Sequence, residues 1–393
     1  MSIDDTTIRD LLGFVDAKGV LSVYTGFSPA QAADPQPTAP IEIRNQLKAL
    51  RAEVAGRDPD LAKVLERRLS EATPAMERLL DPRAAGRGRA LFLGLDDGRS
   101  ETVAVQLPFR ERVVLHDGPY LRPLVAAHDE GRAAGVLVVS RASARVLRWQ
   151  VGEVEELEAQ RFDVSDDVAA PEKAGPSPGN PEHPHHGFVD RDRFEERVAT
   201  QRHRFLRGFA EHVRSLAKQH GWDRLVLSSP PKLREVVEDA LHEDGTLRVL
   251  IADASWEDAS PPAIADAVWP LLRSVHLDRE RTLAAAVLDR RLSGGPAAIG
   301  LRQVCSALNE GRVSHLVFDD ARTVSGYRAE DGSLHPRIEG LVAQSDLDFH
   351  AEPLFLERLV ERAIATGARV TPLEPDAAAH LEEHEGVGAL LRW

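Results

Sequence analysis

The chain has 393 residues, of which 42% are hydrophobic and 28% charged, as in a globular protein of more than one domain. Its net charge of −14 argues against general affinity for nucleic acids or membranes, but a local basic patch can still bind RNA. No apolar run reaches membrane-spanning length and no signal-peptide pattern opens the chain. Cys305, the only cysteine, excludes a disulfide framework, fits a reducing cytoplasm, and occupies an apolar helix position expected in the core.

Residues 1–130 predict an N-terminal α+β domain. Apolar spacing indicates a strand at 19–27, an amphipathic helix after Pro40 and a second helix at about 61–80. An Asp-Asp-Gly turn separates the first two of three further strands. These strands and a short helix are expected at 90–95, 101–107, 111–117 and 120–128.

Residues 131–257 predict a middle domain built on a mixed sheet. An apolar run at 135–140 is followed by a hairpin at 144–150 and 153–162. A long helix at about 191–220 then precedes a strand–helix–strand succession, which implies parallel pairing with helices packed over the sheet. The elements of that succession are expected at 224–229, 231–242 and 247–253.

Residues 258–393 predict a C-terminal domain with three α/β/α layers. A helical region at 263–292 includes Pro270, and helices and strands alternate after it. The insert at 323–349 is polar and weakly patterned. The alternating elements are expected at 297–310, 312–320, 352–366, 368–373, 376–384 and 386–393.

The segment 163–188 has neither a helical nor a strand period and is rich in Pro, Gly and acidic residues. We expect a projecting loop that ends in the sequence His-Pro-His-His-Gly-Phe, because long irregular segments within domains are usually functional or disordered. A metal site at His183, His185 and His186 is an alternative, but the spacing matches no closed zinc pattern. A polar loop with scattered histidines is favoured, so no metal or cofactor is predicted.

Catalytic motifs give no clear signal. The chain has no nucleophile elbow, no phosphate-binding loop and no dinucleotide fingerprint. Ser140, Ser228 and Ser229 follow buried strands without a base to activate them. Asp190 and Asp192 are explained more simply as residues at the positive end of a helix. No catalytic residue is therefore predicted.

Arginines give a stronger signal, because a row of them follows the long helix and the hairpin before it. A stripe of this kind suits RNA phosphates, although interleaved acidic residues also fit an ordinary solvated helix face. A second loop cluster at Arg83, Arg87 and Arg89 fits RNA contact and surface charge equally well. The predicted stripe consists of Arg141, Arg145, Arg148, Arg191, Arg193, Arg197, Arg202, Arg204 and Arg207.

The order of these segments resembles the archaeal/eukaryotic class I release factor and Pelota superfamily, in its bacterial branch, which includes Balon-like hibernation factors. Residues 135–157 are similar to the opening hairpin of the family's middle domain, and 191–213 to the helix that follows its peptide-release loop. Residues 301–320, 354–374 and 386–393 are similar to elements of its C-terminal domain.

Two family motifs are missing from this sequence. The family's release motif is Gly-Gly-Gln at the loop tip, but no glutamine occurs between Gln160 and Gln201. The only Gly-Gly pair, at 294–295, is followed by Pro296, and the codon-reading Asn-Ile-Lys-Ser motif is absent. Stop-codon termination is therefore not expected.

The resemblance implies a tRNA-mimicking protein that occupies the ribosomal A site in hibernation or rescue without releasing the peptide. The loop tip at His183, His185, His186, Gly187 and Phe188 would approach the peptidyl-transferase centre. Implied partners are ribosomal RNA, tRNA and a translational GTPase such as EF-Tu, with no membrane. Two alternatives stay open: a peptidyl-tRNA hydrolase that uses the histidine-tipped loop, and a stand-alone RNA- or tRNA-binding protein.

Overall fold

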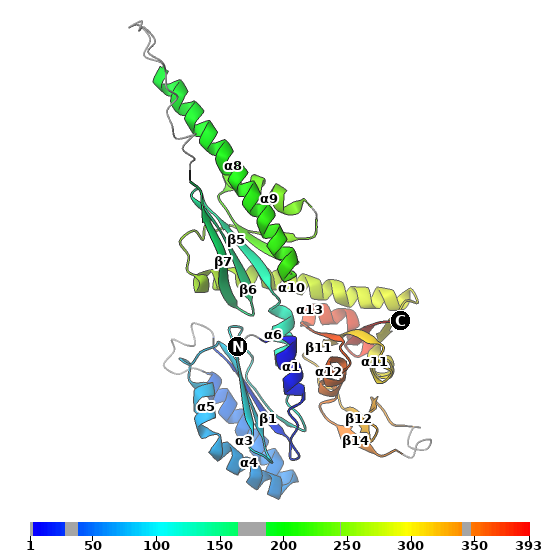
Figure 1. Cartoon of the computed structure of the whole chain (residues 1–393). Helices are drawn as coiled ribbons and strands as arrows, with labels where there is room; N and C mark the ends of the chain where they lie inside the picture. Colours follow the sequence, from blue (N-terminus) through cyan, green and yellow to red (C-terminus); the bar gives the residue numbers. More distant parts are fainter. Residues whose placement is uncertain (1–2, 28–37, 164–185, 244, 340–346) are drawn as a thin grey trace. The chain divides into compact units, whose positions relative to one another are not determined.

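A computed structural model describes residues 3–27, 38–163, 186–243, 245–339 and 347–393, and at 186–193 only the backbone (Figure 1). The chain divides into two compact units: unit 1 combines residues 1–132 with 273–393, and unit 2 is the contiguous segment 133–272. Residues of the expected first and third domains thus share unit 1, and the three-domain division stays a prediction. No helix within the described ranges is long and apolar enough to cross a membrane.

Unit 2 is built on a five-stranded sheet of order β7-β6-β5-β8-β9. Because β5 pairs antiparallel with β6 and parallel with β8, the predicted mixed sheet is confirmed. One face packs against α8 and α9 in a single apolar cluster (Figure 1). On the other face, Trp149 stacks on Trp269 of α10, with ring centroids 5.8 Å apart. The elements are β5 (Ala134–Val139), β6 (Ser143–Gln150), β7 (Glu153–Arg161), α8 (His186–His220), β8 (Arg224–Ser228), α9 (Pro231–His242), β9 (Arg248–Ala252) and α10 (Pro261–Leu292).

Helix α8 is 35 residues long and begins at His186, inside the segment that was expected to be a loop. Five prolines lie between residues 163 and 186, the last of them Pro184. Proline disfavours helix in the residue before it and cannot donate a backbone hydrogen bond, so the stretch after Pro184 is the first that can join the helix. The amphipathic period alone did not locate that start.

The N-terminal part of unit 1 is an antiparallel sheet of order β3-β2-β1-β4, with helices α3, α4 and α5 on one face. The predicted single helix at 61–80 is wrong, because Ala72 interrupts it and two helices, α4 and α5, lie on either side. Pro74 lacks an N–H and its ring crowds the preceding turn, while the Thr73 hydroxyl donates to the Ser70 carbonyl at 2.8 Å. The elements are α1 (Asp5–Leu12), β1 (Val20–Gly26), α3 (Ala39–Arg57), α4 (Pro59–Glu71), α5 (Thr73–Leu80), β2 (Gly88–Gly94), β3 (Ser100–Val105), β4 (Arg112–His116) and α6 (Arg122–Glu130).

The C-terminal part of unit 1 has a mixed sheet of order β10-β16-β11-β15, in which β11 and β15 are parallel. Helices α10 and α13 pack on the face that carries Val317 and Leu373, and the predicted α/β class is confirmed. The insert at 323–349 contributes to a small sheet of order β13-β12-β14 that the weak pattern did not indicate. The elements are β10 (Ala297–Ile299), α11 (Gly300–Asn309), β11 (Val313–Asp319), β12 (Gly326–Ala329), β13 (Leu334–His335), β14 (Phe349–Glu352), α12 (Phe355–Ala365), β15 (Arg369–Leu373), α13 (Pro375–Ala378), the 3-10 helix η1 (Ala379–His384) and β16 (Val387–Leu391).

Buried polar contacts join the two segments of unit 1. The backbone N–H of Leu121 donates to the carboxyl of Glu357 at 2.5 Å, and both groups are buried. Arg122, also buried, pairs with Asp320 at 2.8 Å. Burial makes these contacts more costly to break than surface ion pairs, which explains why the two distant segments form one unit.

Candidate functional site

The predicted loop tip lies largely outside the residues that the structure describes. His183 and His185 belong to the segment 164–185, which is not described. His186, Gly187 and Phe188 form the first turn of α8, where the backbone alone is described. The same holds for Arg191 and Arg193, so the proposed contacts of all seven residues stay predictions.

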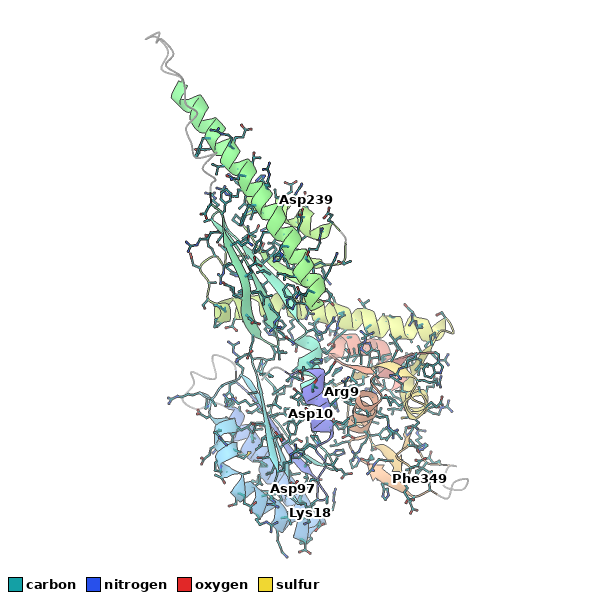
Figure 2. All side chains as sticks on the ribbon, viewed as in Figure 1. Arg9, Asp10, Lys18, Asp97, Asp239 and Phe349 are labelled. Carbon is teal, nitrogen blue, oxygen red and sulfur yellow. The ribbon has the colours of Figure 1, made fainter. Side chains whose placement is uncertain are left out.

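Further along α8, exposed arginines lie opposite the buried face. Arg197, Arg204 and Arg207 are exposed and are spaced by seven and three residues, which places them on one side of the helix. The opposite side buries an apolar stripe of Leu206, Phe209, Ala210, Val213 and Ala217. In Figure 2, α9, marked by Asp239, lies along α8.

Arg202 is placed differently from these three. It is half-buried, and its guanidinium lies over the ring of Phe162, 5.2 Å from the ring centroid, just beyond the end of β7. Phe162 in turn packs against Phe205. Arg202 therefore helps to fasten α8 to the sheet by a cation–π contact, whatever else it binds.

Two of the three hairpin arginines hold the sheet together. Arg145 pairs with Glu156 at 2.6 Å and also donates to the Glu257 carbonyl at 3.1 Å. Arg148 pairs with Glu155 at 2.7 Å. Arg141, in the turn, is exposed. Of the hairpin positions, Arg141 thus presents its charge most openly to a partner.

A histidine–carboxylate pair on α8 and β7 was not found from the sequence. His212 Nε2 lies 2.8 Å from a carboxylate oxygen of Glu158, and both side chains are partly exposed. Hydrogen bonds from Gln160 and His212 lower the pKa of Glu158 below its ordinary value. The two residues are 54 positions apart, so only the register of β7 beside α8 could have revealed the pair.

The serines considered as nucleophiles serve the backbone instead. The Ser140 hydroxyl accepts from the N–H groups of Ala142 and Ser143 and so forms the β5–β6 turn. The Ser228 hydroxyl donates to the Ala254 carbonyl at 2.8 Å. The side chains of Asp190 and Asp192 lie outside the described residues. Within the described ranges, no group of three or more His, Cys, Asp or Glu side chains is arranged to hold a metal ion.

Two positions outside unit 2 bear on the sequence predictions. Cys305 is 2% exposed, and burial raises the pKa of its thiol to about 12, so its assignment to the core is confirmed.

Arg89 is neither a surface charge nor open to contact with RNA, the two roles considered for its cluster, because it is only 4% exposed. Its guanidinium donates to the carbonyls of Leu79 at 2.9 Å and Gly86 at 2.8 Å, and therefore fastens the loop after α5. Arg83 is exposed.

Comparison with known proteins gives one family match. Residues 119–270 match the model of "Bacterial archaeo-eukaryotic release factor family 10", a range that includes the hairpin and α8. No curated protein matches the chain.

Solved structures show a distant likeness. The archaeal translation termination factor aRF1 is 17% identical over 100% of this chain and 99% of its own, with a TM-score of 0.25. Pelota from Archaeoglobus fulgidus is 15% identical over 78% of this chain and 79% of its own, with a TM-score of 0.35. An archaeal Pelota described as ribosome-bound, with ABCE1, is 13% identical over 100% and 95%, with a TM-score of 0.42.

Proposed function

We propose that the chain, whose residues 119–270 match a bacterial family of archaeo-eukaryotic release factors, is a tRNA-mimicking factor that occupies the ribosomal A site. The observation that carries the proposal is α8, a long helix in the matched segment whose described outer face bears Arg197, Arg204 and Arg207. In a chain of net charge −14, such a local row of guanidinium groups selects phosphates at one place rather than binding polyanions generally.

The mode of action would be steric. A protein held in the A site excludes aminoacyl-tRNA, and this suits ribosome hibernation or rescue. Residues 163–188 would lie toward the peptidyl-transferase centre, and the absence of glutamine between Gln160 and Gln201 supports a role without peptide release. Arg191, Arg193 and the histidines at 183, 185 and 186 would contact ribosomal RNA or the tRNA acceptor end.

The remaining partners derive from the same family assignment. The N-terminal part would lie near the decoding centre. The C-terminal part would contact the stalk base or a translational GTPase such as EF-Tu. These placements rest on the family and on no described contact of this chain.

Co-sedimentation with 70S ribosomes over a series of salt concentrations tests ribosome binding. Arg204→Ala should weaken binding and lower the slope of log affinity against log salt by about one, because one phosphate contact is lost. Lys232→Ala, which removes one exposed charge from α9, should leave both quantities unchanged. Equal effects of the two substitutions, or no binding of the wild type at moderate salt, would contradict the proposal and favour a stand-alone RNA-binding protein.

A second assay separates occupancy from hydrolysis. Ribosomes carrying labelled peptidyl-tRNA are incubated with the protein, and release of the peptide is measured. We expect the label to stay on tRNA. Release that disappears in the double variant His185→Ala, His186→Ala would instead establish the hydrolase alternative, in which the histidines position water or act as a general base.

A further inference from the structure

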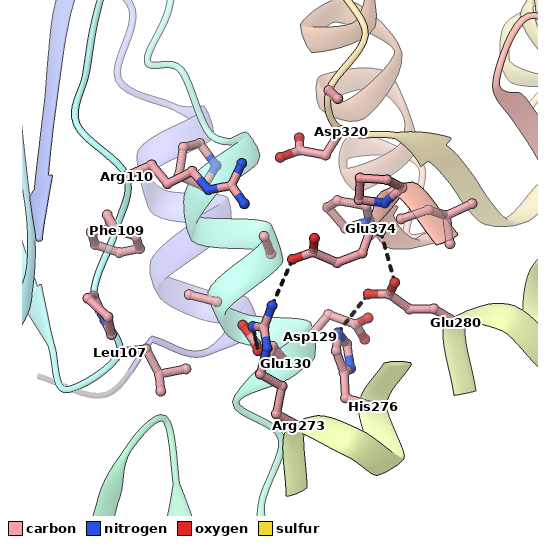
Figure 3. Close-up of a pocket in the computed structure, with 18 of the residues that line it drawn as sticks. Leu107, Phe109, Arg110, Asp129, Glu130, Arg273, His276, Glu280, Asp320 and Glu374 are labelled. Atoms are coloured by element: carbon pink, nitrogen blue, oxygen red, sulfur yellow. Dashed lines mark hydrogen bonds and ion pairs between the residues drawn. The ribbon is translucent and has the colours of Figure 1, made fainter. Parts of the chain in front are cut away.

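Unit 1 contains a cavity of about 300 Å³, and no residue of α8 lines it (Figure 3). It opens where the adjacent parallel strands β11 and β15 end, at Asp319 and Leu373. The edge formed by the carboxyl ends of parallel strands is the usual ligand site of open α/β sheets. Its other walls come from α6, α10 and the connection between β3 and β4.

The carboxylates that line the cavity are held by cationic or imidazole groups. Each of them contacts an arginine or a histidine of unit 1. The contacts are Asp129–Arg279 at 2.5 Å, Glu130–Arg273 at 2.5 Å, Glu374–Arg273 at 3.1 Å, Asp320–Arg122 at 2.8 Å and Glu280–His276 at 2.8 Å. Because Arg273 is shared by two carboxylates, these contacts fix the walls of the cavity without cancelling all of their negative charge.

Two arginines of the lining carry charge without a carboxylate partner among the described residues. Arg110 is exposed on the β3–β4 connection, and Figure 3 shows it at the side of the cavity opposite Glu280. Arg112 is exposed and lies over the ring of Tyr120, 5.6 Å from its centroid. The unpaired positive charge of the lining is thus concentrated at these two side chains, where it favours an anionic group.

One of the residues that line the cavity, His276, has an unsatisfied polar atom. His276 is 5% exposed, and its Nε2 lies 2.8 Å from Glu280. Its Nδ1 is buried and has no hydrogen-bond partner among the described residues. Buried polar atoms nearly always have a partner, so this nitrogen is available to a polar group of a ligand.

We propose that this cavity binds a nucleotide. The phosphate would meet Arg110 and Arg112, and the base would lie against the apolar wall and reach His276 with a polar edge. The volume is at the lower end of ligand sites and suits a single nucleotide. The wall includes Pro123, Ala126, Pro372 and Pro375, whose rigid flat surfaces suit a planar ring. The site shares no residue with the row of arginines on α8, since all of its residues lie in unit 1.

Calorimetric titration of the full chain tests this site. The probes are AMP, GMP, CMP and UMP, with inorganic phosphate and the free nucleosides as partial ligands. We expect at least one nucleotide to bind more tightly than phosphate or its nucleoside alone. Arg110→Ala should weaken that binding about tenfold, since an exposed charge-assisted contact is lost. Ala126→Phe, which fills the cavity from α6, should abolish it.

Arg9→Ala is the matched control, because Arg9 is exposed on α1 and does not line the cavity. It should leave the affinity unchanged, and circular dichroism should show that all three variants are folded. Three results would each overturn the proposal. These are no binding of any nucleotide at millimolar concentration, undiminished binding by the Ala126→Phe variant, and binding of phosphate alone as tight as that of every nucleotide.

Discussion

At the scale of single residues, Glu357 shows how burial turns a charged side chain into a neutral one. One of its carboxyl oxygens accepts from the Leu121 N–H, and the other has no hydrogen-bond partner among the described residues. Burial raises the pKa of Glu357 to about 8, so the group is mostly protonated at neutral pH. Glu357 therefore joins the two segments of unit 1 as a neutral acid, and raising the pH should weaken that junction.

We predict that Glu357→Gln gains stability relative to the wild type as the pH rises from about 5 to 8. In this window an unfolded glutamate, with a pKa of 4.5, has lost its proton while folded Glu357 keeps it. Each pH unit therefore lowers the wild-type free energy of unfolding by about 1.4 kcal/mol, and glutamine removes this contribution. Urea unfolding of both proteins at several pH values measures the difference. Glu383→Gln, at an exposed position, is the control, and a difference that does not vary with pH would refute the prediction.

Single residues also show why part of the candidate site was hidden in the sequence. Arg145 and Arg204 look alike in a basic stripe, but Arg145 is held by Glu156 while Arg204 is exposed. Arg89 stands in a loop-like Arg-Gly-Arg sequence, yet its guanidinium is buried among carbonyls. These differences depend on partners distant in the sequence, which periodicity does not identify. Cys305, by contrast, was correctly predicted to lie in the core, because the spacing of apolar residues in its own helix is enough to show which face is buried.

At the scale of elements, hydrophobic period predicted most helices and strands of both units. The hydrophobic period did not show which proline interrupts a helix and which lies within one. Pro74 divides the predicted helix at 61–80, whereas Pro270 lies inside α10 without ending it. A proline leaves the carbonyl four residues before it without its helical hydrogen bond. Whether the helix continues depends on whether neighbouring groups bond to that carbonyl, and the hydrophobic period carries no information about them. The small sheet at β12–β14 was missed because strands of two to four residues are too short to show a period.

Helix α8 permits a prediction that needs no substitution. From Leu206 onward one face of the helix is buried, whereas Phe194, Glu195, Glu196 and Arg197 are all exposed. Helical segments without tertiary packing are marginally stable in water, so amides at 194–201 should exchange with deuterium faster than those at 206–217. Hydrogen exchange followed by mass spectrometry measures this gradient. Added ribosomes should slow exchange at 194–201, and uniform exchange along the helix would contradict the packing argument.

At the scale of the whole molecule, the sequence order of the domains does not reveal which of them fold together. Unit 1 brings residues 1–132 and 273–393 together, although all of unit 2 lies between them in the sequence. The domain boundaries predicted near residues 131 and 258 divide the sequence but carry no information about contacts between distant segments. The cavity proposed to bind a nucleotide illustrates the consequence, because its residues come from both segments and no local motif could have indicated it.

This arrangement predicts different behaviour of the fragments. The segment 133–272 contains a complete five-stranded sheet and the whole of its apolar cluster, so it should fold alone and unfold cooperatively on heating. The segment 273–393 alone would leave Glu357 and Asp320 without Leu121 and Arg122. An uncompensated buried group destabilises a fold strongly, so this fragment should lack a cooperative transition. Co-expression with residues 1–132 should restore it, and the two fragments should co-purify. A cooperative transition of 273–393 alone, at the midpoint seen in the full chain, would show instead that the junction contributes little and that the C-terminal part folds independently.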